Sequence, residues 1–524
     1  MVNNKETGSY YTPYELVNFM CRYLQNNCQN FKKVLEPSAG DGRFLSVLVN
    51  FCENIKAIEL CEEKVSEIRE KYQQKSVKVE RYNFLDYAKE TEEKYDLIIG
   101  NPPYINPKIM LSEDLDKAKE ICELEKIASS VMQNMWLAFV VGACRILEND
   151  GTIFFVLPME FMQVQYAEKL REYLEKKFNT IHILSFEEPI FPEIEQDICL
   201  VYMANKEKES PYILYEVYHD AKSREPVFRN VIKKNKPLKK WSNAVLSDEE
   251  ILLLKNKSME YQSVDKMGVS APGIVTGGNK YFILTEQKVQ EYYCEQYVLP
   301  ILQKSSYISN NTIILDESIM NELKEKDKPV YLLNLSNVSK NEMPLELWEY
   351  LEWAKGQKVG EEKLVDRYKC KNRTPWYGVP IVNKGQVIFF KRYHLIPRVY
   401  INRADIYTTD AGYHIRLNTD IDEESLVFCF YNSLTLAQCE FQGRYYGGGV
   451  GELVPSEFKE LRIPYRKIEK RDIEKLNEMF QKGMEIEKIV QFVNEKTIGC
   501  EMSEEELEKI EKIRKKLIGR RCKR

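Results

Sequence analysis

The chain has 524 residues, of which 44% are hydrophobic and 30% are charged, and its formal net charge is −5. This length and composition predict a soluble globular protein of two domains, and the acidic balance means that any surface for nucleic acid must be local. An apolar run long enough to span a bilayer is absent from the sequence, and the polar N-terminus lacks a signal-peptide core.

The first two hundred residues alternate between strand-like and helix-like segments. Strands are predicted where apolar residues cluster, at residues 33–36, 55–60, 77–82, 95–100, 152–158, 181–184 and 198–203. Residues 138–147 have the amphipathic pattern of a helix, which ends at Asn149, Asp150 and Gly151. Strands that alternate with helices predict an α/β fold with a doubly wound, largely parallel sheet.

A glycine turn follows the first predicted strand, because Glu36 is followed by Gly40 and Gly42 and then by an apolar helix start at Phe44. Such a turn lets the backbone approach a ligand, and the helix N-terminus offers free N–H groups. The full dinucleotide-binding pattern is absent, which disfavours a nicotinamide cofactor. Glu59 ends the next strand, where a carboxylate either accepts ribose hydroxyls or is an ordinary surface acid.

Two further motifs follow the third and fourth strands. After the third strand, Asn83 can hydrogen-bond an adenine edge and Phe84 can cover its face, although Phe84 can equally fill the core. After the fourth come Asn101, Pro102, Pro103 and Tyr104. Two prolines cannot continue a strand, so the chain turns and holds Asn101 and Tyr104 rigidly at the strand's carboxyl end. An amide oxygen, proline carbonyls and an aromatic ring suit a flat base that carries an amino group, and an ordinary proline-rich turn is the alternative.

The second half of the chain loses this alternation. Residues 222–241 hold eight cations against Glu225 alone, and we interpret them as the exit from the first domain, either a solvated linker or a bridge that contacts phosphates. Residues 363–403 hold ten cations against Asp366, with seven aromatic residues interleaved. Such residues bind phosphates and stack on bases, although a charged surface over an aromatic core gives the same pattern. Residues 503–516 predict a charged helix, and residues 520–524 a frayed basic tail.

The motifs occur in one order, beginning with a Thr-Gly-Ser-Tyr-Tyr-Thr-Pro segment at residues 7–13 and continuing through residues 36–42, Glu59, residues 83–84 and residues 101–104. In this order the chain resembles the γ class of S-adenosylmethionine-dependent DNA adenine methyltransferases, of the TaqI restriction-modification type. The resemblance covers residues 7–203 well and is looser beyond them. There residues 276–280 and 447–451 look like family features, and Gly447 to Gly449 form either a loop close to the backbone of a ligand or a flexible turn.

The resemblance implies a Rossmann-like class I methyltransferase domain at residues 1–240, an α+β target-recognition domain at 241–470 and C-terminal helices at 471–524. It implies catalytic roles for Asn101, Pro102, Tyr104 and Phe191, the last of which is a packed loop residue in the alternative interpretation. The S-adenosylmethionine contacts that it implies are Thr12, Glu36, Ser38, Gly40, Gly42, Glu59, Asn83, Phe84 and Asn101. The family often has Asp at the position of Asn83, and Asp86 competes for that role. Candidate DNA contacts are Arg373, Lys391, Arg392 and Arg398.

The expected activity is transfer of a methyl group to the exocyclic amino group of a flipped adenine in duplex DNA. An RNA methyltransferase, a protein-glutamine methyltransferase with the same turn, and a catalytically silent DNA-binding specificity protein are the alternatives. The 13 cysteines contain no CxxC pair and there are four histidines, which argues against a metal site or disulfides and favours reduced thiols in the cytoplasm. A monomer is expected, without a membrane partner, and the sequence leaves open whether a restriction endonuclease accompanies it.

Overall fold

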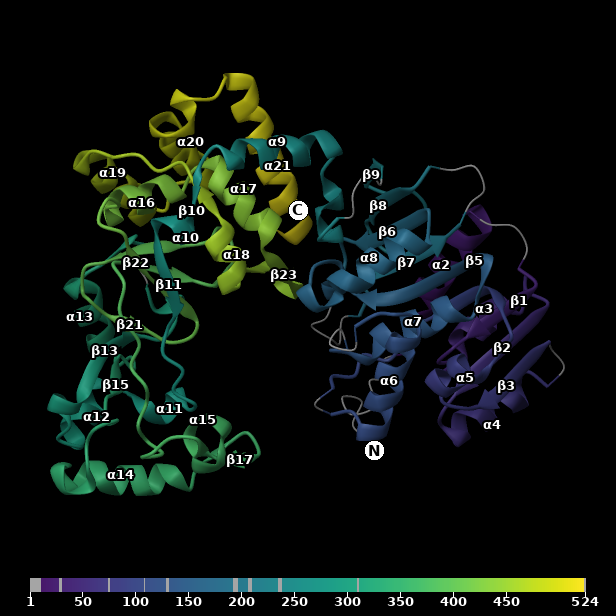
Figure 1. Cartoon of the computed structure of the whole chain (residues 1–524), viewed down its shortest axis with the longest axis horizontal. Coiled ribbons are helices and arrows are strands. Elements are labelled where there is room, and N and C mark those ends of the chain that lie inside the picture. Colours follow the sequence, from purple (N-terminus) through teal and green to yellow (C-terminus); the bar gives the residue numbers. More distant parts are fainter. Residues whose placement is uncertain are drawn as a thin grey trace. The chain divides into compact units, whose positions relative to one another are not determined.

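The computed structural model describes residues 11–27, 31–73, 76–107, 109–128, 132–191, 197–205, 210–233, 238–308 and 311–522 (Figure 1). Within these ranges the chain forms two compact units. The first comprises Met1–Glu249 together with two short returns, Tyr445–Gly449 and Gly519–Arg524. The second comprises Glu250–Arg444 and Val450–Ile518. The first unit is therefore built from three separate stretches of sequence.

One nine-stranded sheet is the centre of the first unit, with the order β3-β2-β1-β4-β5-β7-β6-β8-β9. Its strands are β1 (Lys33–Glu36), β2 (Asn54–Glu59), β3 (Val77–Arg81), β4 (Tyr95–Gly100), β5 (Leu147–Pro158), β6 (Thr180–Phe186), β7 (Ile198–Ala204), β8 (Tyr212–Tyr218) and β9 (Phe228–Lys233). Neighbours from β3 to β5 are parallel, whereas β7 runs antiparallel to both β5 and β6. This arrangement confirms the predicted doubly wound α/β fold and all seven strands expected from the sequence.

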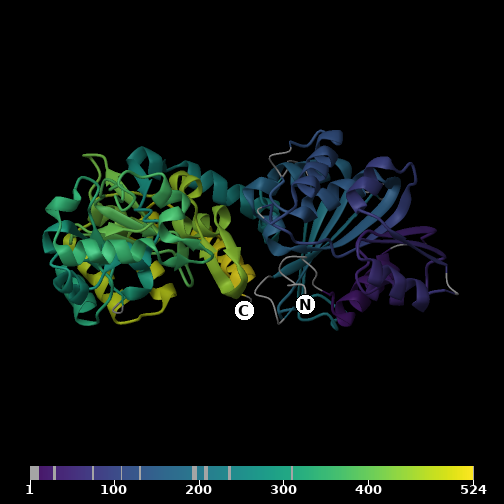
Figure 2. The same ribbon diagram turned by 90° about the horizontal axis from the view of Figure 1, so that it is seen from below.

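Helices lie on both sides of this sheet (Figures 1 and 2). They are α2 (Tyr14–Asn27), α3 (Arg43–Leu48), α4 (Glu62–Lys71), α5 (Phe84–Glu90), α6 (Ser112–Leu124), α7 (Met135–Arg145) and α8 (Glu168–Lys177). Apolar residues of α2, α3 and α4 share one core cluster with alternate residues of the strands, such as Val34, Leu97 and Val156. Helices α5, α6 and α7 contact one another instead. The alternation of strand side chains thus gives the sheet two covered faces.

The segment at residues 222–241 differs from a solvated linker, which was one of its two interpretations. Part of it is β9, the edge strand that pairs antiparallel with β8. Its last residue, Trp241, is fully buried and packs edge-to-face on Phe161. The basic residues of this segment therefore flank a structured edge of the first unit, and the interpretation as a solvated linker was wrong for the described part.

The predicted frayed tail was also wrong for its described residues, 520–522, because they belong to α21 (Glu504–Cys522). Arg520 donates hydrogen bonds of 2.7 Å to the carbonyl of Ser242 and to Oδ1 of Asn243. Arg521 is 2% exposed and donates to the carbonyl of Gly449. Both arginines are therefore held by oxygen acceptors of the first unit, and Arg521 is buried there.

The return at Tyr445–Gly449 is also held by hydrogen bonds to the first unit. Tyr445, in β23 (Arg444–Tyr446), is buried, and its N–H donates to Oε1 of Gln163 at 3.1 Å. The amide nitrogen of Gln163 donates in turn to the carbonyl of Tyr445. Gly448 and Gly449 follow with φ of 75° and 74°, so the glycines are needed for the turn itself.

The second unit contains several small sheets, the largest with the order β11-β22-β18-β20-β14. Its strands are β10 (Gln262–Ser263), β11 (Gly268–Pro272), β12 (Ile283–Leu284), β13 (Val298–Leu302), β14 (Ile314–Leu315), β15 (Tyr331–Leu333), β16 (Lys358–Val359), β17 (Glu362–Lys363), β18 (Val387–Phe390), β19 (Arg392–Tyr393), β20 (Val399–Asn402), β21 (Tyr407–Thr408), β22 (Gly412–Leu417), β24 (Val450–Glu452) and β25 (Arg462–Ile463). Its helices are α9 (Asp248–Met259), α10 (Val264–Met267), α11 (Asn279–Phe282), α12 (Glu286–Glu291), α13 (Glu317–Glu325), α14 (Leu345–Lys355), α15 (Tyr368–Lys371), α16 (Glu423–Phe430), α17 (Ser433–Gln442), α18 (Pro455–Glu460), α19 (Lys470–Gln481), α20 (Ile486–Lys496) and most of α21.

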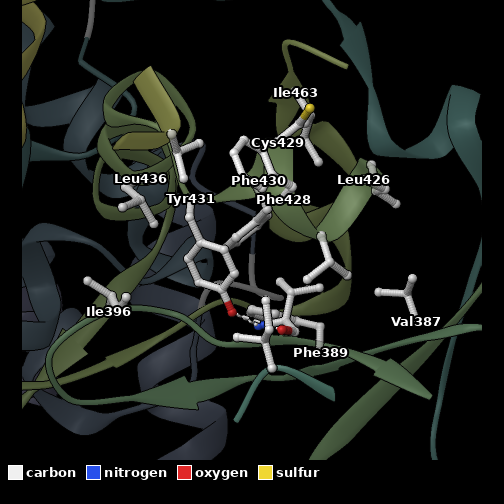
Figure 3. Close-up of a cluster of buried hydrophobic side chains, with 14 of the residues drawn as sticks. Val387, Phe389, Ile396, Leu426, Phe428, Cys429, Phe430, Tyr431, Leu436 and Ile463 are labelled. Atoms are coloured by element: carbon white, nitrogen blue, oxygen red, sulfur yellow. Dashed lines mark hydrogen bonds between the residues drawn. The ribbon is translucent and has the colours of Figure 1, made fainter. Parts of the chain in front are cut away.

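The main core of the second unit joins the five-stranded sheet to the later helices (Figure 3). Phe389 of β18 stacks on Phe458 of α18, with 4.2 Å between ring centroids. The hydroxyl of Tyr431 donates to the carbonyl of Val399 at 2.8 Å and accepts from its N–H at 3.0 Å. Helices α19 and α20 contribute to the same core, so they fold together with the sheet. In the described part of the chain, no helix is long and apolar enough to cross a membrane.

Candidate active site

The carboxyl ends of β1 and β4 bring two predicted motifs to one edge of the sheet. The strands are parallel neighbours, with Val34 opposite Leu97. A Cβ atom on Gly100, the last residue of β4, would lie 3.4 Å from Cδ of Pro37. The hydroxyl of Ser38 donates a hydrogen bond of 3.1 Å to the main-chain carbonyl of Asn101. Strand pairing therefore places the glycine turn beside the Asn-Pro-Pro-Tyr turn, at the edge where open α/β sheets bind ligands.

Glu36 is the buried acid of this edge. Its side chain is 1% exposed, and its Oε2 has no hydrogen-bond partner in the described part of the chain. Burial raises the pKa of the Glu36 carboxyl well above its usual value, and the negative charges of Asp41 and Glu59 raise it further. A buried carboxyl without a partner costs free energy, so this position is suited to a ligand group that is cationic or donates a hydrogen bond.

The glycine turn and Glu59 are tied together. Gly40 and Gly42 have φ of 56° and 73°, in the left-handed region that favours glycine. The N–H of Gly40 donates to Oε2 of Glu59 at 2.8 Å, and the N–H of Cys61 donates to Oε1 at 2.9 Å. The Glu59 carboxylate is therefore fixed at the end of β2, with its orientation set by the main chain on either side.

Asn101 is oriented by the segment that precedes α2. Its Nδ2 donates to the hydroxyl of Thr12 at 3.1 Å, and Thr12 is 5% exposed. Arg43 holds the same segment, because it donates to the carbonyl of Thr12 at 2.9 Å and forms an ion pair of 2.8 Å with Asp41. The donor side of the Asn101 amide thus faces Thr12, which fixes the plane in which its oxygen lies. The preceding residues of this motif, Thr7 to Tyr10, lie outside the described part.

Tyr104 and Phe191 belong to the same side of the sheet. Both are partly buried and pack against the core cluster that contains α2, α3 and α4. The hydroxyl of Tyr104 donates to the carbonyl of Val156 in β5 at 3.0 Å. Burial raises the pKa of Tyr104 well above its usual value, so the hydroxyl stays protonated and keeps this anchor. Pro192, the next residue of the predicted Ile-Phe-Pro motif, lies outside the described part.

Asn83 and Phe84 have local structural roles. Oδ1 of Asn83 accepts from the N–H of Leu85 at 2.9 Å and caps α5, while Nδ2 donates to Asp114 at 3.3 Å. Phe84 is 2% exposed, and its ring lies 4.7 Å from that of Phe139. The core-filling alternative therefore describes the Phe84 ring, which has no exposed face to cover an adenine. Asp86, the competitor for the role of Asn83, forms an ion pair of 2.8 Å with Lys117.

The four candidate DNA contacts of the second unit divide by their partners. Arg373 donates to the carbonyls of Thr276 and Val275 at 2.6 and 2.7 Å. Arg398 donates to the carbonyls of Asn311 and Thr312 at 2.5 and 3.1 Å and lies 4.4 Å from the Phe480 ring centroid. Arg392 forms an ion pair of 3.4 Å with Glu452, and Lys391 is partly buried beside it. Two of the four arginine and lysine side chains therefore brace loops of their own unit.

The interleaved aromatic residues of the region 363–403 are mostly core. Tyr377, Phe389, Phe390, Tyr393 and Tyr400 are buried, and Trp376 is partly buried. Tyr368, in contrast, is 76% exposed. The alternative of a charged surface over an aromatic core thus describes this region, and Tyr368 is the aromatic side chain that can reach a ligand.

Comparison with known proteins assigns the two halves of the chain. Residues 32–191 match the model of the Eco57I restriction-modification methylases, and residues 238–498 match the model of the C-terminal domain of the type II methyltransferase M.Eco57I. The chain belongs to the Eco57I restriction-modification methylase family. The doubly wound sheet is accordingly the methylase half, and the second unit coincides largely with the family's C-terminal domain.

Individual members of the family are distant in sequence. The type II methyltransferase M.AccI of Acinetobacter calcoaceticus is 24% identical over 488 residues, which cover 87% of this chain and 85% of that protein. The type II restriction enzyme and methyltransferase RM.Eco57I of Escherichia coli is 26% identical over 209 residues, which cover 38% of this chain and 20% of that protein. Among solved structures, the type IIL restriction-modification enzyme MmeI in complex with DNA matches with a TM-score of 0.59 at 12% identity, over 96% of this chain and 75% of that one. This structural likeness supports the fold.

Several residues at the methylase site were not predicted from the sequence. Tyr11 and Tyr14 each have their ring centroid 5.2 Å from the guanidinium of Arg43, and all three are partly exposed or exposed. Arg43 follows Gly42 directly, and Tyr11 precedes Thr12, so both stand next to predicted positions. The signal that could have found them is this adjacency of an arginine and two aromatic residues to the motifs of a single site.

Proposed function

We propose that this methylase transfers a methyl group from S-adenosylmethionine to the exocyclic amino group of an adenine in duplex DNA, at a specific sequence. The proposal rests on the hydrogen bonds that hold the glycine turn after β1 and the Asn-Pro-Pro-Tyr turn after β4 together. Ser38 of the glycine turn bonds the main chain of Asn101, and Thr12 bonds its side chain. Gly100, the residue before Asn101, lies beside the buried acid Glu36, since an added Cβ would be 3.9 Å from Cγ of Glu36, and a cationic methyl donor would lie near both.

The residues at this edge fit S-adenosylmethionine. The ligand carries an ammonium and a sulfonium, and three carboxylates, those of Glu36, Asp41 and Glu59, lie at this edge. Burial raises the pKa of Glu36, and the charges of the other two carboxylates raise it further. The unpartnered Oε2 of Glu36 can accept a hydrogen bond from the ammonium of the ligand. Glu59, at the end of β2, can accept hydrogen bonds from the ribose hydroxyls. The left-handed Gly40 leaves room for the ligand beside the main chain. When bound, S-adenosylmethionine supplies an electrophilic methyl group on sulfur.

Asn101 and Pro102 would prepare the attacking nitrogen. The lone pair of an adenine amino group is delocalised into the purine ring, so the nitrogen is a weak nucleophile. Oδ1 of Asn101 and the carbonyl of Pro102 are neutral acceptors, and each can accept a hydrogen bond from one N–H of the adenine amino group. These two hydrogen bonds favour a tetrahedral nitrogen. Acceptors that are already fixed, as Thr12 and Ser38 fix Asn101, need no reorganisation during the reaction.

Tyr104 and Phe191 would hold the extruded base. Chemistry on a base in a duplex requires the nucleotide to leave the stack, which costs a few kcal/mol. Stacking on aromatic side chains offsets part of that cost, and the anchored hydroxyl of Tyr104 keeps its ring in place. For Asn83 and Phe84 we propose only main-chain or amide contacts to the cofactor adenine, because the Phe84 ring is enclosed.

The second unit is the proposed reader of DNA sequence. We propose a catalytic domain at residues 1–240, a target-recognition domain at 241–470 and C-terminal helices at 471–524, with the short returns at Tyr445–Gly449 and Gly519–Arg524 completing the first unit. The MmeI enzyme, whose fold is similar, was solved in complex with DNA, which supports this assignment. A cognate restriction endonuclease is a further expectation, since RM.Eco57I carries both activities by name. We expect a cytoplasmic monomer.

The test is methyl transfer from labelled S-adenosylmethionine to duplex DNA, followed by digestion to nucleosides and identification of the methylated base. N6-methyladenine at a fixed sequence is the expected product. Matched arms with RNA and with bulk protein distinguish the alternative methyltransferases. Asn101→Ala should lose activity, while Asn106→Ala, an exposed amide in the same loop, should retain it. Methylated cytosine, or label in RNA or protein instead of DNA, would contradict the proposal.

A further inference from the structure

A cavity of about 500 Å³ lies in the second unit, far along the chain from the methylase motifs. Its wall is formed by the loop at residues 275–281, by β16 through Lys358 and Val359, and by Arg367 and Asp410. All of these residues belong to the second unit. The loop contains the Thr-Gly-Gly-Asn-Lys sequence at residues 276–280, to which the methyl-transfer reaction assigns no role.

Two arginines donate hydrogen bonds to the carbonyl groups of this loop. Arg373 donates to the carbonyls of Val275 and Thr276, and Arg367 donates to the carbonyl of Gly277. In a planar trans peptide the following N–H points opposite to the carbonyl. The N–H groups of Thr276 and Gly277 are therefore directed away from the arginines that hold the carbonyls.

These two N–H groups have no hydrogen-bond partner among the described residues, whereas the next one, of Gly278, donates to the hydroxyl of Thr276 at 3.0 Å. Thr276 is 1% exposed, so water reaches its main chain poorly. Buried main-chain N–H groups are almost always paired, and an orphan at the wall of a cavity therefore indicates a bound acceptor.

Side-chain donors surround the same space. The hydroxyl of Thr276 donates to Oδ1 of Asn279, so the NH2 group of that amide lies on the other side and is unpaired within the described residues. Lys280 and Lys358 are exposed and form no ion pair with any described residue. Asp410 is the one carboxylate among the residues that line the cavity. The wall thus presents N–H donors and cations in excess of negative charge.

We propose that this cavity binds a phosphate of the DNA backbone. The inference rests on the proposed function as a DNA methyltransferase and adds a contact to it. A phosphodiester offers acceptor oxygens and a negative charge, which match unpaired N–H groups and lysines. Main-chain amides and lysines carry no information about base identity, so the cavity sets the register of the second unit on the duplex and does not read the sequence. Arg373 is a positioning residue that holds the loop from outside the cavity, whereas Arg367 both holds the loop and forms part of the wall.

The experiment measures duplex binding of the full chain by fluorescence anisotropy between 50 and 300 mM salt, conditions that span roughly the range over which phosphate contacts are screened. The double variant Lys280→Gln/Lys358→Gln removes the two unpaired cations. Each lost phosphate contact reduces the magnitude of the slope of log affinity against log salt by about 0.9, so loss of the single phosphate in the cavity should reduce it by about 1. Lys512→Gln, an exposed lysine of α21 outside the cavity, is the control and should leave the slope unchanged.

The outcomes separate the two proposals. If the wild-type protein binds and methylates duplex DNA but the double variant keeps the wild-type slope, the cavity is not a phosphate site and the proposed function stands. If the wild-type protein does not bind duplex DNA, the proposed function fails and the cavity assignment fails with it. Equal weakening for cognate and unrelated duplexes is expected, and a loss confined to the cognate duplex would show base readout and overturn the backbone assignment.

Discussion

His414 predicts how the stability of the second unit depends on pH. The imidazole lies in β22, is 1% exposed, and has a main-chain N–H directed at each ring nitrogen. Thr408 N is 3.0 Å from Nε2, and Gly385 N is 3.3 Å from Nδ1. A neutral ring can accept from one of these donors, but an imidazolium can accept from neither. Burial lowers the pKa of His414 from 6.5 to about 4, and the charge of Lys384 contributes.

The sign follows from the comparison with the unfolded chain. Between pH 6.5 and about 4 the unfolded state binds a proton at this position and the folded state does not, so stability falls as the pH falls. The stabilisation is complete above pH 6.5. At about 1.4 kcal/mol for each pH unit, the loss reaches roughly 2.5 kcal/mol at pH 4.5 and about 3 kcal/mol below pH 4. This is a substantial part of the 5–15 kcal/mol that typically stabilises a domain, so acid should weaken the second unit noticeably.

The assay compares urea unfolding of the wild-type protein and of His414→Gln at several pH values. Other titrating groups are common to both proteins, so the difference between the two unfolding free energies isolates His414. The advantage of wild type should shrink by about 2.5 kcal/mol between pH 7 and pH 4.5. A constant difference across this range, or a His414 resonance that titrates between pH 6 and 7 in NMR spectra, would refute the reasoning.

Three further predictions concern the methylase site. Asn101→Ala should lower turnover, measured by labelled methyl transfer, by about 10²–10³-fold. Its affinity for S-adenosylmethionine, measured by calorimetry, should stay within about threefold of wild type. Full activity of this variant would contradict the role of the amide. Tyr104→Ala should reduce 2-aminopurine fluorescence at the target position more than it reduces duplex affinity, and an unchanged signal would exclude stacking by Tyr104. Glu36→Gln should weaken S-adenosylmethionine binding by about 10–100-fold. Its unfolding free energy at pH 8 without ligand should be no lower than that of wild type, because the pKa of Glu36 is raised in the folded state and ionisation above the unfolded pKa costs stability.

The methylase half was predictable from sequence because its signals are local. The strands from β1 to β7 are short apolar runs that end at turns, and parallel pairing then forces Glu36, Glu59 and Asn101 to one edge. What the pattern could not show is which side chain bonds which. The bond from Asn101 to Thr12 joins residues 89 positions apart, and no periodicity encodes such a pair.

The second half was harder to predict because charged and aromatic residues can either contact DNA or hold their own unit together. Arg373 and Arg398 look like DNA contacts in the sequence, yet both donate to loop carbonyls of their own unit. The aromatic residues near them are mostly core. The end of the chain misled in the same way, since the sequence of Arg520 and Arg521 is typical of a tail while both side chains bind carbonyl groups. Composition cannot distinguish an arginine that faces solvent from one that caps a buried main chain.

The returns of the chain at Tyr445–Gly449 and Gly519–Arg524 restrict how this protein can be recombined. A fragment cut after Glu249 would leave the Gln163 amide without its main-chain partner and Ser242 and Asn243 without Arg520. If the second unit is exchanged between relatives, these short pieces must therefore come from the same protein as the amino-terminal half. In a chimaera joined at a single crossover near residue 249, the two returns would come from one protein and the rest of the first unit from another, so their contacts would be mismatched. A graft confined to residues 250–444 would keep both returns native.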